Sequence, residues 1–503
     1  MITSFAVGNF RAFEDSGELP LRPLTCLVGR NSSGKSSILH ALLVLRQSIE
    51  QRAVGSRVPQ LNLNGSLIDA GSYADIVHHH KQDRQVEFNF GLRVEPLPDF
   101  TIPGANRASP SLSHIRTPLV AMDVPRPPSM RYVSQLFRGA RQRPELEKPH
   151  DIKVSMAFLP EPPFGPTLSR LFIEVVGLGQ VTFTRTVKKH RVQHWRAYPI
   201  GIAPKTLAVF FPQWSFLPHV GAREAQLSRL QPAQRNHTTD FIWYVYRAFR
   251  DIDSFLSDLR LVGPFRTPPA RRYSFTGLAA VDAGSSGERA VDLLITEKLI
   301  RTTGQPLRTA VSYWLRRLGL ARKISIRDVA KRSNIFELAV SGAGPARIAN
   351  FADVGFGVSQ VLPVLVQGFL VPRGGTYIAQ QPELHLHPDA QAGLADFFIY
   401  LASRGVRVIL ETHSEYLLVR LRRRLAEGIK PIQIGIPAED PVRPMHIDRD
   451  SVSVIYVGNN SGSAGVSLMQ IDESFQFDSM PAGFMSQAID DRLKLMKALR
   501  KST

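Results

Sequence analysis

The stretch Gly29-Arg30-Asn31-Ser32-Ser33-Gly34-Lys35-Ser36-Ser37 decides how the rest of this chain is interpreted. It reads G-x-x-x-x-G-K-S, follows the apolar run 24–28, and precedes a helical pattern from Ser36 to about residue 51. A strand, a glycine-rich loop and a helix in this order are typical of a phosphate-binding loop. Backbone N–H groups and the positive end of the helix would hold phosphate oxygens. We expect Lys35 to reach the β- and γ-phosphates and the Ser36 hydroxyl to ligate Mg²⁺.

Length and composition indicate a large globular protein. A chain of 503 residues exceeds the size at which one hydrophobic core usually stops growing, so we expect more than one lobe. No run approaches the length of a membrane span and the N-terminus lacks a signal-peptide pattern, so the sequence predicts a cytoplasmic protein without a membrane partner. The single cysteine, Cys26, excludes internal disulfides and is expected in the core.

The net charge favours an acidic partner. Lys and Arg exceed Asp and Glu by 62 to 43, which gives a formal charge of +19. DNA or RNA would suit this excess, although an acidic partner protein or solubility also accounts for it. Segment 185–205 mixes basic residues with Trp195 and Tyr198, a composition that suits nucleic-acid contact and equally a solvated strand face.

Hydrophobic periodicity predicts the remaining elements. We expect strands at 2–7, 86–94, 172–187, 324–329, 335–340 and 452–457, the last at the edge of the second lobe, and helices at 241–261 and 309–318. The expected divisions are an N-terminal head part at 1–95, a β-rich basic insertion at 96–240 with a flexible Pro/Arg-rich segment at 96–150, a helical linking lobe at 241–340, and a C-terminal head part at 341–503.

The C-terminal third contains three further polar segments. A Gly/Ser loop at 353–360 precedes an apolar helix at 361–370. A short apolar strand at 376–379 runs into the sequence QQPELHLHP at 380–388, and a strand at 406–410 ends at ETHSE, 411–415. Ligands bind at the carboxyl ends of such strands in α/β sheets. His385, His387 and His413 with Glu383 could instead hold zinc, but their order beside a phosphate loop favours a nucleotide site.

These motifs together resemble the ATP-binding-cassette-type (ABC-type) AAA-family ATPases of the SMC, OLD and Septu kind. The similarity is greatest to compact ATPases without a coiled coil from bacterial anti-phage operons. It implies an α/β fold, a P-loop ABC-type ATPase head with a mixed sheet, β-rich N-terminal insertions and an α-helical lobe. It rests on NFRAF at 9–13, the phosphate loop, LNLNG at 61–65, LVGPFR at 261–266, the serine signature at 353–360, PELHLHP at 382–388 and ETHS at 411–414.

In that family two subunits enclose two ATP molecules, so the resemblance implies a homodimer, or a higher oligomer, with ATP and Mg²⁺ as cofactors. Gly357 and Ser359 would reach the γ-phosphate held by the other subunit, and His413 would sense the γ-phosphate as the switch histidine. Segment 63–77 would couple the nucleotide state to the rest of the protein.

One position departs from the family pattern. The family places an acidic residue that holds Mg²⁺ through water at the position of Gln380, followed by Glu or Gln at that of Gln381. A carboxamide can orient water but cannot accept a proton. We therefore expect reduced hydrolysis if Gln380 replaces a glutamate, either naturally or as a deliberate substitution, and Glu383 is the nearest remaining carboxylate for a general base.

Three functions compete on this evidence. The first is an ATPase that dimerises on ATP and gates a separate effector subunit such as a nuclease, because the chain lacks H-N-H and toprim patterns of its own. The second is an ATP-stabilised scaffold that binds an effector or DNA and hydrolyses little, which Gln380 and Gln381 favour. The third, a transporter cassette, is disfavoured by the basic insertions and the NFRAF motif.

Overall fold

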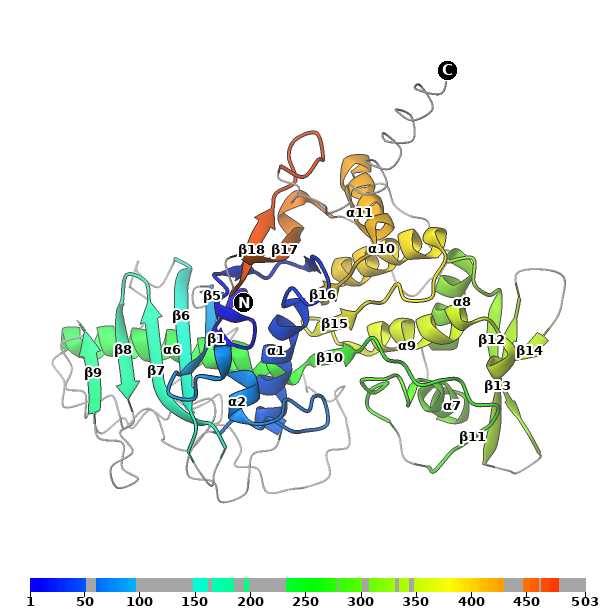
Figure 1. Cartoon of the computed structure of the whole chain (residues 1–503), viewed down its shortest axis with the longest axis horizontal. Helices are drawn as coiled ribbons and strands as arrows, with labels where there is room; N and C mark the ends of the chain where they lie inside the picture. The colour runs from blue at the N-terminus through cyan, green and yellow to red at the C-terminus, as the bar shows by residue number, and fades with distance from the viewer. Residues whose placement is uncertain are drawn as a thin grey trace, which may run out of the picture.

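The computed structural model describes residues 1–50, 60–95, 148–161, 165–184, 194–198, 232–277, 280–300, 307–330, 334–342, 348–428, 447–460 and 463–478. The predicted Pro/Arg-rich segment up to residue 147, and the basic segment 185–205 apart from one strand, lie outside these residues. The described part contains three sheets and their covering helices (Figure 1). No helix within these ranges is long and apolar enough to cross a membrane.

A six-stranded sheet lies at the centre and carries the phosphate loop. Its strand order is β10 (Leu259–Val262), β15 (Thr376–Gln380), β16 (Arg407–Glu411), β4 (Leu24–Val28), β17 (Val452–Asn460) and β18 (Ser463–Met469). The first five strands run parallel and β18 is antiparallel. The carboxyl ends of β10, β15, β16 and β4 therefore meet at one edge, which is where ligands bind in open α/β sheets.

Successive residues of the central strands belong to different cores. Leu27, Ile378 and Ile409 pack into the core on one face of the sheet. Cys26 and Leu410 pack into the core on the other. A parallel sheet covered on both faces is apolar along its whole length, which explains why these strands read as continuous apolar runs and not as alternating patterns.

An antiparallel sheet forms the N-terminal lobe. Its order is β2 (Phe13–Asp15), β1 (Ile2–Phe10), β5 (Val86–Val94), β6 (His150–Leu159), β7 (Thr167–Val175), β8 (Gly179–Thr184) and β9 (His194–Tyr198), and β3 (Leu19–Pro20) pairs with β1. Helices α1 (Lys35–Glu50) and α6 (Pro232–Ser257) share one core with it. Strands from both sides of residue 96 thus belong to one sheet, so the described strands of the predicted insertion extend the first lobe.

Helices cover the other face of the central sheet. They are α7 (Ala290–Ile300), α8 (Leu307–Arg317), α9 (Phe356–Leu370), α10 (Pro388–Ser403) and α11 (Glu415–Glu427). A small sheet flanks them, with β12 (Lys323–Asp328) and β14 (Ile348–Asn350) on β13 (Ile335–Ser341), and β13 also pairs with β11 (Tyr273–Ser274). The buried Trp314 joins the helices through ring contacts with Phe397 and Tyr400.

Three sequence predictions need correction. The predicted helix 241–261 is α6, which ends at Ser257, followed by β10, which forms because β15 offers a parallel partner. The predicted strand 172–187 corresponds to β7 and β8, joined by a turn in which Gly177 has φ +84°. Strand β17 lies inside the central sheet beside β4 and not at an edge.

Candidate nucleotide site

The phosphate loop packs so closely that two of its positions require glycine. Gly29 has φ +143°, and a Cβ there would lie 2.2 Å from the backbone oxygen of Val457 on β17. Gly34 has φ +106°, and a Cβ there would lie 3.1 Å from the Phe13 ring. The loop is therefore held against β17 on one side and β2 on the other, with α1 starting directly after it at Lys35.

Lys35 is folded back over the loop. The side chain is 3 % exposed, and Nζ donates hydrogen bonds to the backbone oxygens of Gly29, at 3.0 Å, and Arg30, at 2.6 Å. Burial lowers the pKa of this ammonium group, and the charge of Glu411 opposes that effect. Asn31 and Ser32 are exposed.

The serines of the loop suit an anionic ligand. Ser33 is 5 % exposed, and its hydroxyl has no hydrogen-bond partner among the described residues. Ser37 stands in the first turn of α1, where its amide bonds to the Gly34 oxygen at 2.9 Å. A buried, unpartnered hydroxyl is rare unless a ligand or water completes it. These residues fit a triphosphate held by the loop.

Glu411 is the acidic residue of this site, and its role was missed in the sequence. Its Oε1 accepts a hydrogen bond from the Ser36 hydroxyl at 2.7 Å, and its Oε2 accepts one from Gln380 Nε2 at 2.9 Å. Glu411 is 4 % exposed and Gln380 is 6 % exposed. The two residues are register partners on β15 and β16. The only sequence signal for this role was the glutamate that ends the apolar strand before THS.

The turn after β15 is fixed by Arg266. Arg266 is 6 % exposed, and its Nη2 donates to the backbone oxygens of Gln380, at 3.0 Å, and Gln381, at 2.9 Å. Gln381 has φ +44°, and its amide donates to the Glu411 oxygen at 2.7 Å. The Gln380 side chain is therefore held towards β16 by a rigid backbone.

Glu383 and His413 meet behind this turn. Glu383 Oε1 accepts a hydrogen bond from the His413 amide at 2.7 Å, and Glu383 is 6 % exposed. Burial raises the pKa of the Glu383 carboxyl, and the bond from the His413 amide opposes that rise. The exposed His413 has a lowered pKa through desolvation and the charge of Lys35, so it favours the neutral form. Glu383 therefore holds the backbone of His413 in place.

The serine signature lies at the start of α9. Ser359 is 2 % exposed inside α9, and its hydroxyl donates to the Phe356 backbone oxygen at 2.9 Å. The hydroxyl is therefore engaged within its own helix in this structure, and the contact of Ser359 with a γ-phosphate held by a second subunit stays a prediction. The exposed start of α9 is formed by Gly355 and Phe356, with Gly357 half-buried behind them.

His385 and segment 63–77 both make contacts with neighbouring elements of the fold. His385 has φ +62° and its ring lies 6.0 Å from that of Phe356. The described residues contain no group of three or more His, Cys, Asp or Glu side chains arranged to hold a metal ion. Segment 63–77 is tied to α1 by Gln47, whose Nε2 donates to the backbone oxygens of Asn62, at 2.7 Å, and Ile68, at 3.2 Å.

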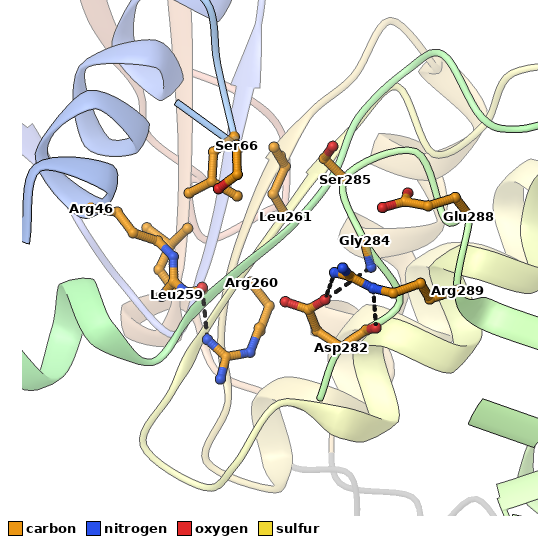
Figure 2. Close-up of a pocket in the computed structure, with 11 residues that line it drawn as sticks. Arg46, Ser66, Leu259, Arg260, Leu261, Asp282, Gly284, Ser285, Glu288 and Arg289 are labelled. Carbon is orange, nitrogen blue, oxygen red and sulfur yellow. Dashed lines mark hydrogen bonds and ion pairs between the residues drawn. The ribbon is translucent and has the colours of Figure 1, made fainter. Parts of the chain in front are cut away.

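A cavity of about 200 Å³ lies beside segment 63–77, between α1, β10 and the loop at 282–289. Figure 2 shows Arg289 pointing at Asp282, with which it forms an ion pair, and Arg260 turned towards the Leu259 backbone oxygen. Glu288 bonds to Ser286 within its own loop. The polar side chains named here bond to neighbours in the cavity wall, whereas the Ser33 hydroxyl of the phosphate loop has no partner among the described residues.

Taken together, the described residues at the sheet edge have the groups that a triphosphate and a divalent cation would need. Lys35 and the backbone of the loop would hold phosphate oxygens, and Ser36 with Glu411 would hold Mg²⁺. Bound Mg²⁺ would neutralise charge on the phosphates during hydrolysis.

Two family models match parts of the chain that include residues of this site. Residues 1–90 match the family model described as "AAA ATPase domain". Residues 216–420 match the model described as "AAA domain, putative AbiEii toxin, Type IV TA system". The first range contains Lys35 and Ser36, and the second contains Gln380, Glu411 and His413, so the two matches cover both halves of the site. A search of curated proteins found no match.

Several solved structures match over most of the chain, with low sequence identity and low TM-scores. An SMC head bound to the C-winged helix domain of ScpA is 13% identical, with 94% of this chain and 99% of that chain covered and a TM-score of 0.40. A Pyrococcus furiosus SMC head with an extended coiled coil, bound to the C-terminal domain of ScpA, is 11% identical, with 99% of each chain covered and a TM-score of 0.39. The Thermotoga maritima SMC head domain is 7% identical, with 93% of this chain and 99% of that chain covered and a TM-score of 0.34. At these scores the fold assignment rests on the strand order and the phosphate loop. With the two family matches, each over less than half of the chain, these features show a P-loop ATPase fold.

Proposed function

We propose that this chain is an ABC-type ATPase subunit that dimerises around ATP and regulates a separate effector, a nuclease, in bacterial anti-phage defence. The observation that carries the ATPase part is the hydrogen bond between Ser36 and Glu411, which joins the phosphate loop to the carboxyl end of β16. A hydroxyl paired with a buried carboxylate beside a phosphate loop is suited to Mg²⁺–ATP. The second family description, of a toxin–antitoxin system, supports a role alongside a partner.

Two exposed aromatic side chains support dimerisation through the ATP-binding edge. Phe265 is 88 % exposed and Phe356 is 68 % exposed. Phe265 follows β10, and Phe356 lies against His385 after β15, so both belong to the edge that carries the phosphate loop. Exposed aromatic residues are enriched at protein interfaces.

Sedimentation with and without Mg²⁺–ATP tests the dimer. We expect a nucleotide-dependent dimer that Phe356→Asp abolishes while the monomer still binds ATP. Val176→Asp is the matched control, because Val176 is 46 % exposed in the turn after β7, away from this edge. A Phe356→Asp protein that dimerises on ATP as well as the control would contradict this interface.

A scaffold that binds ATP and hydrolyses little is the second candidate, and Gln380 favours it. Steady-state ATP turnover of the natural chain separates the two candidates. Turnover near background would support the scaffold, whereas substantial turnover would support the ATPase.

The effector and nucleic acid are tested by purification from the native operon. The formal charge of +19 supports a DNA or RNA contact, which should weaken steeply as salt is raised. Nuclease activity in the purified complex that depends on Lys35 would support the proposed regulation. A complex without nuclease activity would contradict that part of the proposal.

A further inference from the structure

We propose that Glu411 supplies the carboxylate of the magnesium site in this chain, and that Gln380 positions it. The inference rests on the proposed ATPase function and names the residues on which its metal dependence relies. It moves the acidic group from the end of β15 to the end of the neighbouring strand β16.

The strand order makes this placement geometrically direct. Strand β16 lies between β15 and the phosphate-loop strand β4. Glu411 is the register partner of Leu27 on β4 and of Gln380 on β15. A side chain at the end of β16 therefore reaches Ser36 without crossing another strand, and the bond of 2.7 Å between Ser36 Oγ and Glu411 Oε1 shows that it does.

The chemistry of the pair explains why a glutamine stands at 380. Gln380 Nε2 donates to Glu411 Oε2 at 2.9 Å, which a glutamate at 380 could not do when ionised. Two buried carboxylates at this separation would repel each other. The amide instead donates to the Glu411 oxygen that does not face Ser36, and so orients the carboxylate.

The surroundings supply the charge that a buried carboxylate needs. Glu411 is 4 % exposed, and the charge of Lys35 on the phosphate loop interacts with it. Its backbone is also fixed, because the Gln381 amide donates to the Glu411 oxygen and the Thr412 amide donates to the Leu27 oxygen. A carboxylate with a rigid backbone, one oxygen held by an amide and the other on the metal-ligating serine is preorganised for a cation.

The test is the magnesium dependence of nucleotide binding, measured by calorimetry with the non-hydrolysable analogue AMP-PNP in Mg²⁺ and in EDTA. We expect Glu411→Gln to reduce the gain in affinity that Mg²⁺ provides by about 10- to 100-fold, the usual effect of losing a metal-site carboxylate or its support. Affinity in EDTA should stay near that of the natural chain, which shows that the loop remains folded. Mn²⁺ bound in the presence of AMP-PNP, followed by electron paramagnetic resonance, should weaken in parallel.

Two further variants complete the design. The exchange Gln380→Glu with Glu411→Gln restores one carboxylate and one amide in the same register and should recover much of the Mg²⁺ gain. Glu415→Gln, four residues along at the start of α11, should leave the gain unchanged. A Glu411→Gln protein with the full Mg²⁺ gain would overturn the inference alone. A natural chain that binds no AMP-PNP with or without Mg²⁺ would instead overturn the proposed ATPase.

Discussion

Replacing Gly29 by alanine tests whether close packing between the phosphate loop and β17 sets nucleotide affinity. Gly29 has φ +143°, and a Cβ would lie 2.2 Å from the Val457 oxygen, well inside van der Waals contact. The obstructing atom belongs to a backbone that is paired with β4 as far as Tyr456 and Val28. The alanine variant must therefore bend the loop, displace β17, or both.

The expected cost follows from two contributions. A non-glycine residue held in a sparsely populated backbone region costs about 1–3 kcal/mol. Inserting an atom into a packed region adds about 1–3 kcal/mol. We expect a total of about 2–6 kcal/mol, shared between lower stability and a displaced loop. If the loop absorbs about 1.4 kcal/mol of this, ATP affinity falls tenfold.

Thermal unfolding measures the loss of stability, and ATP calorimetry measures the loss of nucleotide affinity. Gly17→Ala is the matched control, because Gly17 has φ +66° but a Cβ there would meet nothing within 4 Å. It carries the backbone cost without the collision. We expect Gly29→Ala to lower the unfolding midpoint more than the control and to lose at least tenfold in ATP affinity. Equal midpoints and equal affinities in the two variants would refute the reasoning.

Three further predictions concern residues around the site. Asp396→Asn should destabilise the chain by about 3 kcal/mol, because the 2 % exposed carboxylate of Asp396 pairs with Arg424 and two other arginines. Burial alone would raise the pKa of Asp396, but the bond and charge of Arg424 hold that pKa below its ordinary value of 3.8. The stabilisation that the ionised Asp396 gives to the folded chain is therefore present above pH 3.8 and is lost as the pH falls further. Gln47→Leu should cost about 1–3 kcal/mol and speed hydrogen exchange in segment 60–77, because it leaves buried backbone groups unpaired. Arg266→Met should loosen the turn at Gln381 and lower ATP turnover at least tenfold while ATP binding persists.

Each of these predictions has a result that would contradict it. If the natural and Asp396→Asn proteins differed in stability by the same amount at pH 7 and at pH 3, the ion pairs of Asp396 would not explain the difference. Unchanged exchange of segment 60–77 in Gln47→Leu would show that other contacts hold it. Full turnover in Arg266→Met would show that the β15 turn keeps its shape without the arginine.

Local patterns were sufficient for much of the fold. The apolar run 24–28 and the helix after it correspond to β4 and α1, and the alternating segment 86–94 is β5 with the same bounds. In these elements the hydrophobic pattern of the sequence follows directly from which face of the strand or helix is buried. The phosphate loop could be placed for the same reason, because glycine positions and the lysine are fixed by local backbone geometry.

Elements that depend on a distant partner were not predictable. Strand β10 was merged into the preceding helix, because four apolar residues become a strand only when β15 pairs with them. The burial of Ser359 depends on how α9 packs, which its sequence neighbours do not reveal. Glu411 belongs to the same class, since its contact with Ser36 joins residues that are 375 positions apart.

A carboxylate on β16 has a consequence for switching. Glu411 and His413 are two residues apart, so the proposed metal site and the proposed γ-phosphate sensor share one short segment. That segment is bonded to both neighbours, through the Thr412 amide to Leu27 on β4 and through the His413 amide to Glu383 after β15. Loss of the γ-phosphate would then release Mg²⁺ contacts and the histidine together, and the motion would pass to the β15 turn through Glu383. A family arrangement with the acid on β15 divides these roles between two strands. In this chain one strand end would carry both, so Glu383→Gln should weaken the link between nucleotide state and dimerisation while nucleotide affinity is retained.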